Sequence, residues 1–264
     1  MTVKLIFSII SLLVIIGAPI GFYLIQKKKY KIKFNFWNVV AGILIEFIFK
    51  YVLLNVVMNC LSNINETIYN FLATTIGYVV IDVILTVILL IGGLFIVKKI
   101  YYHNNMSLTA MVSMTLGMTI ADILNSTLMI ALSNLLYILK SNDGTLLEAL
   151  AQQVSNEQAL TVIESYNAMP ADFFLYAGVI TFAMLASNYL TMALFCHSNM
   201  ETHKVGQLIL LTLIIGIYTT VYYFDSPATF AFANPVLLIF AGLQLVFAHV
   251  NAQYMIFIEN EKKK

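Results

Sequence analysis

Long apolar runs alternate with short polar segments along the whole chain. A helix that crosses a bilayer needs about 20 consecutive apolar residues, and the runs reach or exceed this length. The pattern predicts an all-α bundle of seven spans with short connections, over 4–26, 36–61, 71–97, 107–138, 172–196, 205–224 and 229–257. We expect the first run to bend or break near Pro19. We interpret 1–264 as one integral membrane domain.

The lysines gather in alternate connections. They follow the first, third, fifth and seventh runs, whereas only Lys4 and Lys140 fall in the segments on the other side. Cytoplasmic segments of membrane proteins carry such an excess of positive charge. The bias therefore predicts an N-terminus outside and a cytoplasmic C-terminus, and it agrees with an odd number of spans.

The one sizeable connection, 139–171, is predicted on the outer side. Its apolar residues recur at helical spacing, Ser155 and Gln158 have the spacing of a capping box, and Pro170 ends the pattern. We expect two short amphipathic helices that lie on the outer surface. They form either a plain cap over the bundle or a gate for a substrate.

Composition narrows the class of protein. The chain is 61% hydrophobic and 10% charged, far from the roughly 25% charged residues of soluble domains. This excludes a soluble enzyme, a nucleic-acid binder and a disordered chain. We expect a protein of the cell membrane that contacts the lipid bilayer, with other membrane proteins as candidate partners. We expect no cofactor. A composition rich in lysine, asparagine and isoleucine is typical of an AT-rich bacterial genome.

Four ionisable residues lie near the middle of predicted spans: Glu46, Lys50, Asp82 and Asp122. A charge at mid-bilayer costs about 2.5–3.5 kcal/mol on insertion scales, so such residues pair or have a function. Glu46 and Lys50 stand four residues apart and can pair on one helix face. Lys50 can instead neutralise Asp82 or Asp122. Three acids to one lysine leave at least two carboxyls without an obvious cationic partner.

Other polar residues share these spans. Asn125 follows Asp122, Asn188 lies in the fifth run, and His249 is the one histidine within a predicted span. They either join an intramembrane polar site, with Asp122 as the best candidate catalytic residue, or act as hydrogen-bonding contacts between helices. One histidine with scattered acids, and no H-E-x-x-H, predicts no metal site.

Several segments carry a resemblance, in order along the chain. They are Gly17-Ala-Pro-Ile-Gly-Phe-Tyr-Leu with the lysines after it, Gly93-Leu-Phe, Leu116-Gly117, and the loop from Leu146 to Pro170 with Phe174-Leu-Tyr-Ala-Gly178. Together they resemble the YhfC-type glutamic intramembrane proteases. The resemblance implies their helical membrane fold.

The catalytic residues of that family are missing here. Where its members carry two glutamates after Gly-Leu-Phe, this chain has Ile96 and Val97. Met118 stands in place of a histidine and Asp122 in place of a glutamate, while a later histidine falls near Asn188. Peptide hydrolysis needs a base for water and donors for the oxyanion, which isoleucine, valine and methionine cannot supply.

Three functions stay open at this point. The first is a catalytically inactive relative of intramembrane proteases, with a polar intramembrane cavity that binds a membrane protein segment or a lipid. The second is a divergent intramembrane protease that uses Asp122, Asp82 or Glu46 as base. The third is a small proton-coupled transporter, which would explain the buried acids.

Overall fold

The computed structural model describes residues 2–100, 106–152, 154–196 and 227–261. Most of these residues are helical, and none of them forms a strand. The elements are α1 (Thr2–Tyr30), α2 (Phe36–Ile45), the π-helix η1 (Glu46–Leu53), α3 (Leu54–Ser62), α4 (Glu66–Leu72), α5 (Thr75–Ile100), α6 (Leu108–Asp122), the π-helix η2 (Ile123–Thr127), α7 (Leu128–Asn142), α8 (Leu146–Ala151), α9 (Asn156–Ala168), α10 (Phe173–Cys196) and α12 (Pro227–Glu261). The predicted all-α bundle is confirmed.

Six helices are long and apolar enough to cross a membrane. They are Thr2–Tyr30, Phe36–Ser62, Ile76–Ile100, Leu108–Asn142, Phe173–Leu194 and Ala233–Gln253. They match six of the seven predicted spans, and the predicted span over 205–224 lies outside the described residues. The molecule is therefore a multi-pass membrane protein in which apolar helices contact lipid.

The helices near Pro19 and before α5 differ from the prediction. The first span is not interrupted near Pro19, because α1 continues through that residue. The third span begins at Thr75 rather than at 71, after α4 has ended. Thr74 begins α5 by accepting a hydrogen bond from the Gly77 amide at 3.0 Å, as an N-cap residue does.

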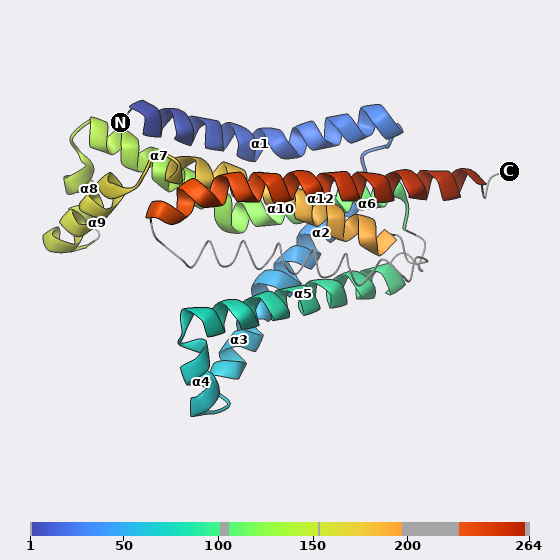
Figure 1. Ribbon diagram of the computed structural model, residues 1–264, viewed down its shortest axis with the longest axis horizontal. Helices are drawn as coiled ribbons and strands as arrows, with labels where there is room; N and C mark the ends of the chain where they lie inside the picture. Colours follow the sequence, from blue (N-terminus) through green and yellow to red (C-terminus); the bar gives the residue numbers. More distant parts are fainter. Residues whose placement is uncertain (1, 101–105, 153, 197–226, 262–264) are drawn as a thin grey trace.

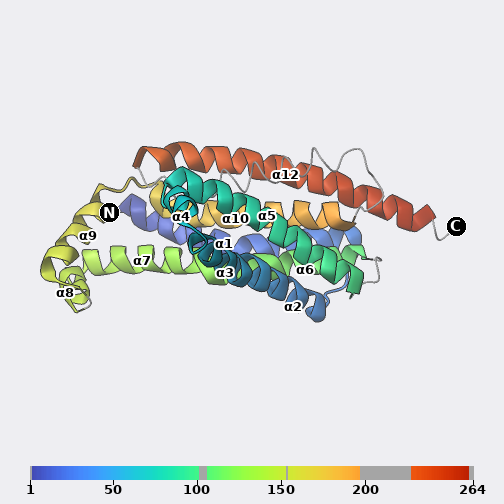
Figure 2. The same cartoon turned by 90° about the horizontal axis from the view of Figure 1, so that it is seen from below.

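The helix α10 lies at the centre of the bundle. Its spanning window is 78% buried, against 22–39% for the other spans, and α1, α6, α7 and α12 pack around it. Figures 1 and 2 show α1, α6–α7, α10 and α12 side by side along the long axis of the molecule. In Figure 1, α2 and α3 leave this layer at a steep angle and α5 runs back beneath it.

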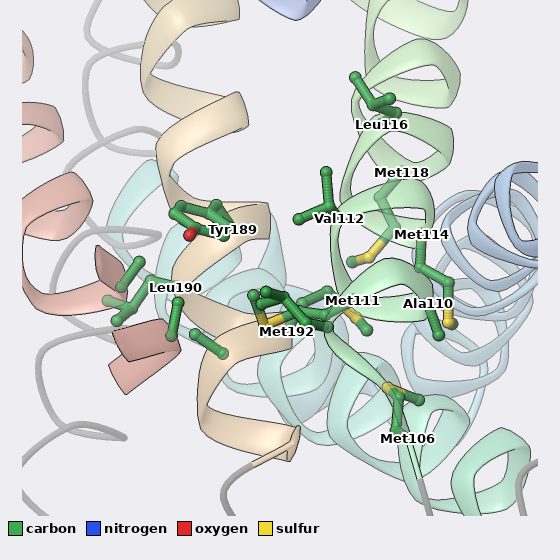
Figure 3. Packing of buried hydrophobic residues seen from close by; sticks show 14 of the residues in the cluster. Met106, Ala110, Met111, Val112, Met114, Leu116, Met118, Tyr189, Leu190 and Met192 are labelled. Carbon is green, nitrogen blue, oxygen red and sulfur yellow. The ribbon is translucent and has the colours of Figure 1, made fainter. Parts of the chain in front are cut away.

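The main core lies between α6 and α10 and is rich in methionine. Met111, Met114 and Met118 of α6 are fully buried, as is Met192 of α10 (Figure 3). Flexible thioether side chains fill the irregular space between closely packed helices. Met118 thus packs in an apolar core.

Two glycines let α2 and α6 approach closely. A Cβ on Gly42 would stand 2.3 Å from the Met114 carbonyl oxygen, and one on Gly117 would stand 2.0 Å from that of Val39. Small residues allow this backbone contact between membrane helices. The contact lies about one turn before Glu46 on α2 and before Asp122 on α6, so it brings these two carboxyls together.

The connection between α7 and α10 forms two short helices at one end of the molecule. α9 begins at a capping box in which Ser155 and Gln158 bond reciprocally, as predicted. Lys4 of α1 donates to the carbonyl oxygens of Tyr166 (3.2 Å) and Asn167 (3.1 Å) at the end of α9. Tyr166 stacks on Tyr137 of α7 with ring centroids 4.2 Å apart, and burial raises the pKa of its hydroxyl. These contacts fix α9 to the bundle.

Candidate functional site

A charged cluster lies where α2 passes through η1 beside the end of α6. Its centre is Lys50, whose ammonium stands 2.6 Å from Oε1 of Glu46 and 2.6 Å from Oδ1 of Asp122. Both acidic residues are fully buried, whereas the Lys50 side chain is 21% exposed. One lysine is thus shared between two buried carboxyls from different helices.

The Asp122 carboxylate has donors on both oxygens. Oδ1 accepts from Lys50 and from the Tyr51 hydroxyl at 2.8 Å, and Oδ2 accepts from the Asn188 side-chain amide at 2.8 Å. The same Asn188 amide lies 3.3 Å from the Thr119 hydroxyl. A buried carboxylate with this many donors is well satisfied. To accept a proton from water, it would have to give up one of these contacts.

Glu46 is satisfied less completely. It touches Lys50 as an ion pair, but neither of its carboxyl oxygens has a hydrogen bond with good geometry in the described part of the chain. A fully buried carboxyl with open hydrogen-bonding capacity is uncommon in folded proteins. Glu46 therefore has room for a further donor.

Asp82 of α5 is the fourth charged residue near the cluster. It is half-buried and lies within electrostatic range of Lys50. Among the described residues it makes no ion pair. The cluster and its neighbour thus contain three carboxyls and one ammonium.

The π-helical turns shape the cluster. In an α-helix, consecutive side chains do not face one partner, yet Lys50 and Tyr51 both contact Asp122. Both lie within η1, whose i→i+5 turns are wider and often occur at functional sites. On α6 the π-turn η2 begins directly after Asp122. The charged cluster therefore lies where two spans each contain a π-helical turn.

Asn125 and His249 lie apart from the cluster. Asn125 is exposed, and its side-chain amide donates to the Ala121 carbonyl at 2.8 Å, which satisfies a backbone group at η2. His249 of α12 lies beside Lys29 and Tyr30, at the end of α1. The structure thus brings together Glu46, Lys50, Asp122 and Asn188, places Asp82 nearby, and positions the other two predicted residues elsewhere.

Sequence reasoning missed Tyr51 as a partner of Asp122. The residue directly after Lys50 would point away from Asp122 in a regular helix. Only the π-turn aligns both side chains, and no signal in the sequence predicts it.

The described residues show no metal centre. In this part of the chain, no three His, Cys, Asp or Glu side chains converge as metal ligands would. Comparisons with protein-family models, with curated proteins and with solved structures found no match.

Proposed function

We propose that this chain is a non-catalytic membrane protein that binds a membrane-embedded partner through the cluster of Glu46, Lys50 and Asp122 and the neighbouring Asp82. One observation supports this above all: the cluster and its neighbour Asp82 contain three carboxyls but only one ammonium. Lys50 is partly exposed, Glu46 has unfilled hydrogen-bonding capacity, and Asp82 has no ion-pair partner among the described residues. A cationic group would balance the excess of carboxyls.

The depth of the cluster favours a protein segment over a lipid as the partner. Lys50 lies in the middle of the Phe36–Ser62 span, whereas lipid headgroups lie at the faces of a hydrocarbon core about 30 Å thick. A lysine or arginine within a partner helix can reach this depth. We therefore propose a transmembrane segment with a cationic residue near its centre.

The resemblance to YhfC-type intramembrane proteases fits this proposal if the chain shares their helical fold but lacks their catalytic residues. Met118 is buried in the apolar core and Ile96 lies exposed on α5, so neither position offers a base. Asp122 is held by Lys50, Tyr51 and Asn188. We propose that a helix bundle of protease type here binds a segment and does not cleave it.

The test uses two synthetic transmembrane peptides that differ at one central position, lysine in one and methionine in the other. Energy transfer between labelled peptide and reconstituted full-length protein measures their association. We expect the lysine peptide to bind more tightly and to stay intact. Equal association of both peptides would refute the proposal, and cleavage of either would support a divergent protease instead.

A second candidate is a proton-coupled transporter. The observation that favours it is the sharing of Lys50 between two buried carboxyls, since binding of one proton would let the lysine pair with a single acid. It predicts pH-driven solute flux in liposomes that Asp122→Asn abolishes.

A further inference from the structure

A second group of polar side chains meets where α1 ends against α12. The Lys29 ammonium lies 2.5 Å from Nε2 of His249, and the Tyr30 hydroxyl lies 3.0 Å from Nδ1 of the same ring. The three residues come from two helices that are far apart in sequence. They are distinct from the charged cluster around Lys50.

The contacts fix which atoms can donate outward. An ammonium only donates, so Nε2 of His249 accepts from Lys29 and the ring proton lies on Nδ1. Nδ1–H then donates to the Tyr30 oxygen, which leaves the Tyr30 O–H free to donate elsewhere. Lys29 keeps two further N–H groups. The group thus offers more donors than acceptors.

No acid balances this group within the described residues. Neither Lys29 nor His249 has a carboxylate at ion-pair distance there. The sequence around Lys29, from 23 to 37, contains no acid. It adds positive charge through four more exposed lysines, Lys27, Lys28, Lys31 and Lys33. A donor-rich, positively charged group without a counter-ion suits an anion, and phosphate oxygens accept several such bonds.

Exposed aromatic side chains mark the depth of this group. Phe34, Phe36 and Trp37 follow the lysines and are 55–68% exposed. Aromatic residues gather where membrane helices reach the headgroup region, and lysine clusters next to a span attract anionic lipids. This is the depth at which phospholipid phosphates lie.

We infer that Lys29, Tyr30 and His249 form a binding site for a phosphate group, supplied by an anionic phospholipid headgroup. Lys29 pairs with the phosphate, the Tyr30 hydroxyl donates to it, and His249 positions both. The lysines around the site attract the negatively charged lipid. This inference is independent of the function proposed for the intramembrane cluster.

The test measures lipid binding to full-length protein in uncharged detergent by native mass spectrometry. The probes are phosphatidylglycerol, phosphatidylcholine and inorganic phosphate. We expect phosphatidylglycerol to bind more tightly than phosphatidylcholine. Lys29→Gln should lower that affinity about tenfold or more, as loss of a charge-assisted hydrogen bond does. Tyr30→Phe and His249→Gln should weaken it as well.

The matched control is Lys33→Gln, which removes an equal charge from the same exposed run and should leave the affinity unchanged. Equal losses for Lys29→Gln and Lys33→Gln would overturn the site, because diffuse charge would then explain the binding. Absence of binding by both phosphatidylglycerol and inorganic phosphate would overturn it too. Lys29-dependent binding of inorganic phosphate alone would retain the phosphate site and assign its ligand to the aqueous phase.

Discussion

At the scale of single residues, Lys50 pairs with two buried carboxyls, and no other cation in the described part of the chain does so. Removing one partner of a buried ion pair leaves an uncompensated charge and commonly costs about 3–5 kcal/mol. Loss of one acid should cost less stability than loss of the lysine, because Lys50 stays paired with the other acid. This asymmetry can be measured.

We expect Lys50→Met to lower the free energy of unfolding by about 3–5 kcal/mol, and Asp122→Asn to lower it less. Thermal unfolding of the purified full-length protein in detergent ranks the two variants. As a control, the triple variant Glu46→Gln, Lys50→Met, Asp122→Asn carries no charge in the cluster and should recover much of the stability. A Lys50→Met protein as stable as the parent chain would contradict the role of Lys50.

The sequence predicted the charged residues better than their partners. Glu46, Lys50, Asp82 and Asp122 stand out because charges are rare in apolar runs. From the sequence, pairing of Lys50 with Glu46 and pairing with Asp122 are alternatives, whereas the structure has both. The contribution of Tyr51 depends on a π-turn that hydrophobic periodicity does not reveal. His249 lies within a predicted span, yet only the packing of α12 on α1 shows that it contacts Lys29.

At the scale of elements, the glycine contact between α2 and α6 sets the distance between Glu46 and Asp122. Any side chain at Gly117 would overlap the Val39 carbonyl, which belongs to a helix backbone and cannot rotate aside. Forcing extra atoms into a packed contact typically costs about 1–3 kcal/mol.

We therefore expect Gly117→Val to lower stability by about 1–3 kcal/mol or more and to separate Lys50 from Asp122. Thermal unfolding measures the first effect, and loss of preference for the lysine peptide measures the second. The matched control is Gly92→Ala on α5, where an added Cβ meets nothing within 4 Å. An unchanged Gly117→Val protein would show that the two helices do not touch there.

The helix α9 provides a second prediction at this scale. Lys4→Met removes the two hydrogen bonds that hold its last carbonyl groups. We expect faster hydrogen exchange of the amides near the end of α9, while α10 stays protected. The control is Lys140→Met, which changes an exposed lysine in the last turn of α7. It should leave hydrogen exchange in α9 unaffected. Equal exchange in both variants would mean that Lys4 does not hold α9.

The apolar runs predicted the spans well, since six of the seven have matching helices and the seventh lies outside the described residues. The boundaries were less predictable where polar residues act locally. α5 begins at Thr75, four residues after the predicted start at 71, because the Thr74 hydroxyl caps the helix. Pro19 does not break α1, although the residue type favours a break in isolation. Packing of α1 against α10 and α7 supports the helix on both sides of the proline.

At the scale of the whole molecule, the lysine distribution predicts the orientation in the membrane. It places the end of α3, with the free and exposed Cys60, on the outer side. In a Cys196→Ala protein, an impermeant thiol reagent should label Cys60 in intact cells. The reciprocal variant Cys60→Ala should not be labelled in intact cells. The reverse pattern would invert the topology.

The central claim is that the excess of carboxyls at mid-membrane recognises a cation of a partner helix. A double-mutant cycle tests it most directly, by combining the lysine and methionine peptides with the parent protein and with Asp82→Asn. The account predicts that Asp82→Asn reduces the preference for the lysine peptide about fivefold or more, as coupling between close charges requires. An undiminished preference in Asp82→Asn would contradict it.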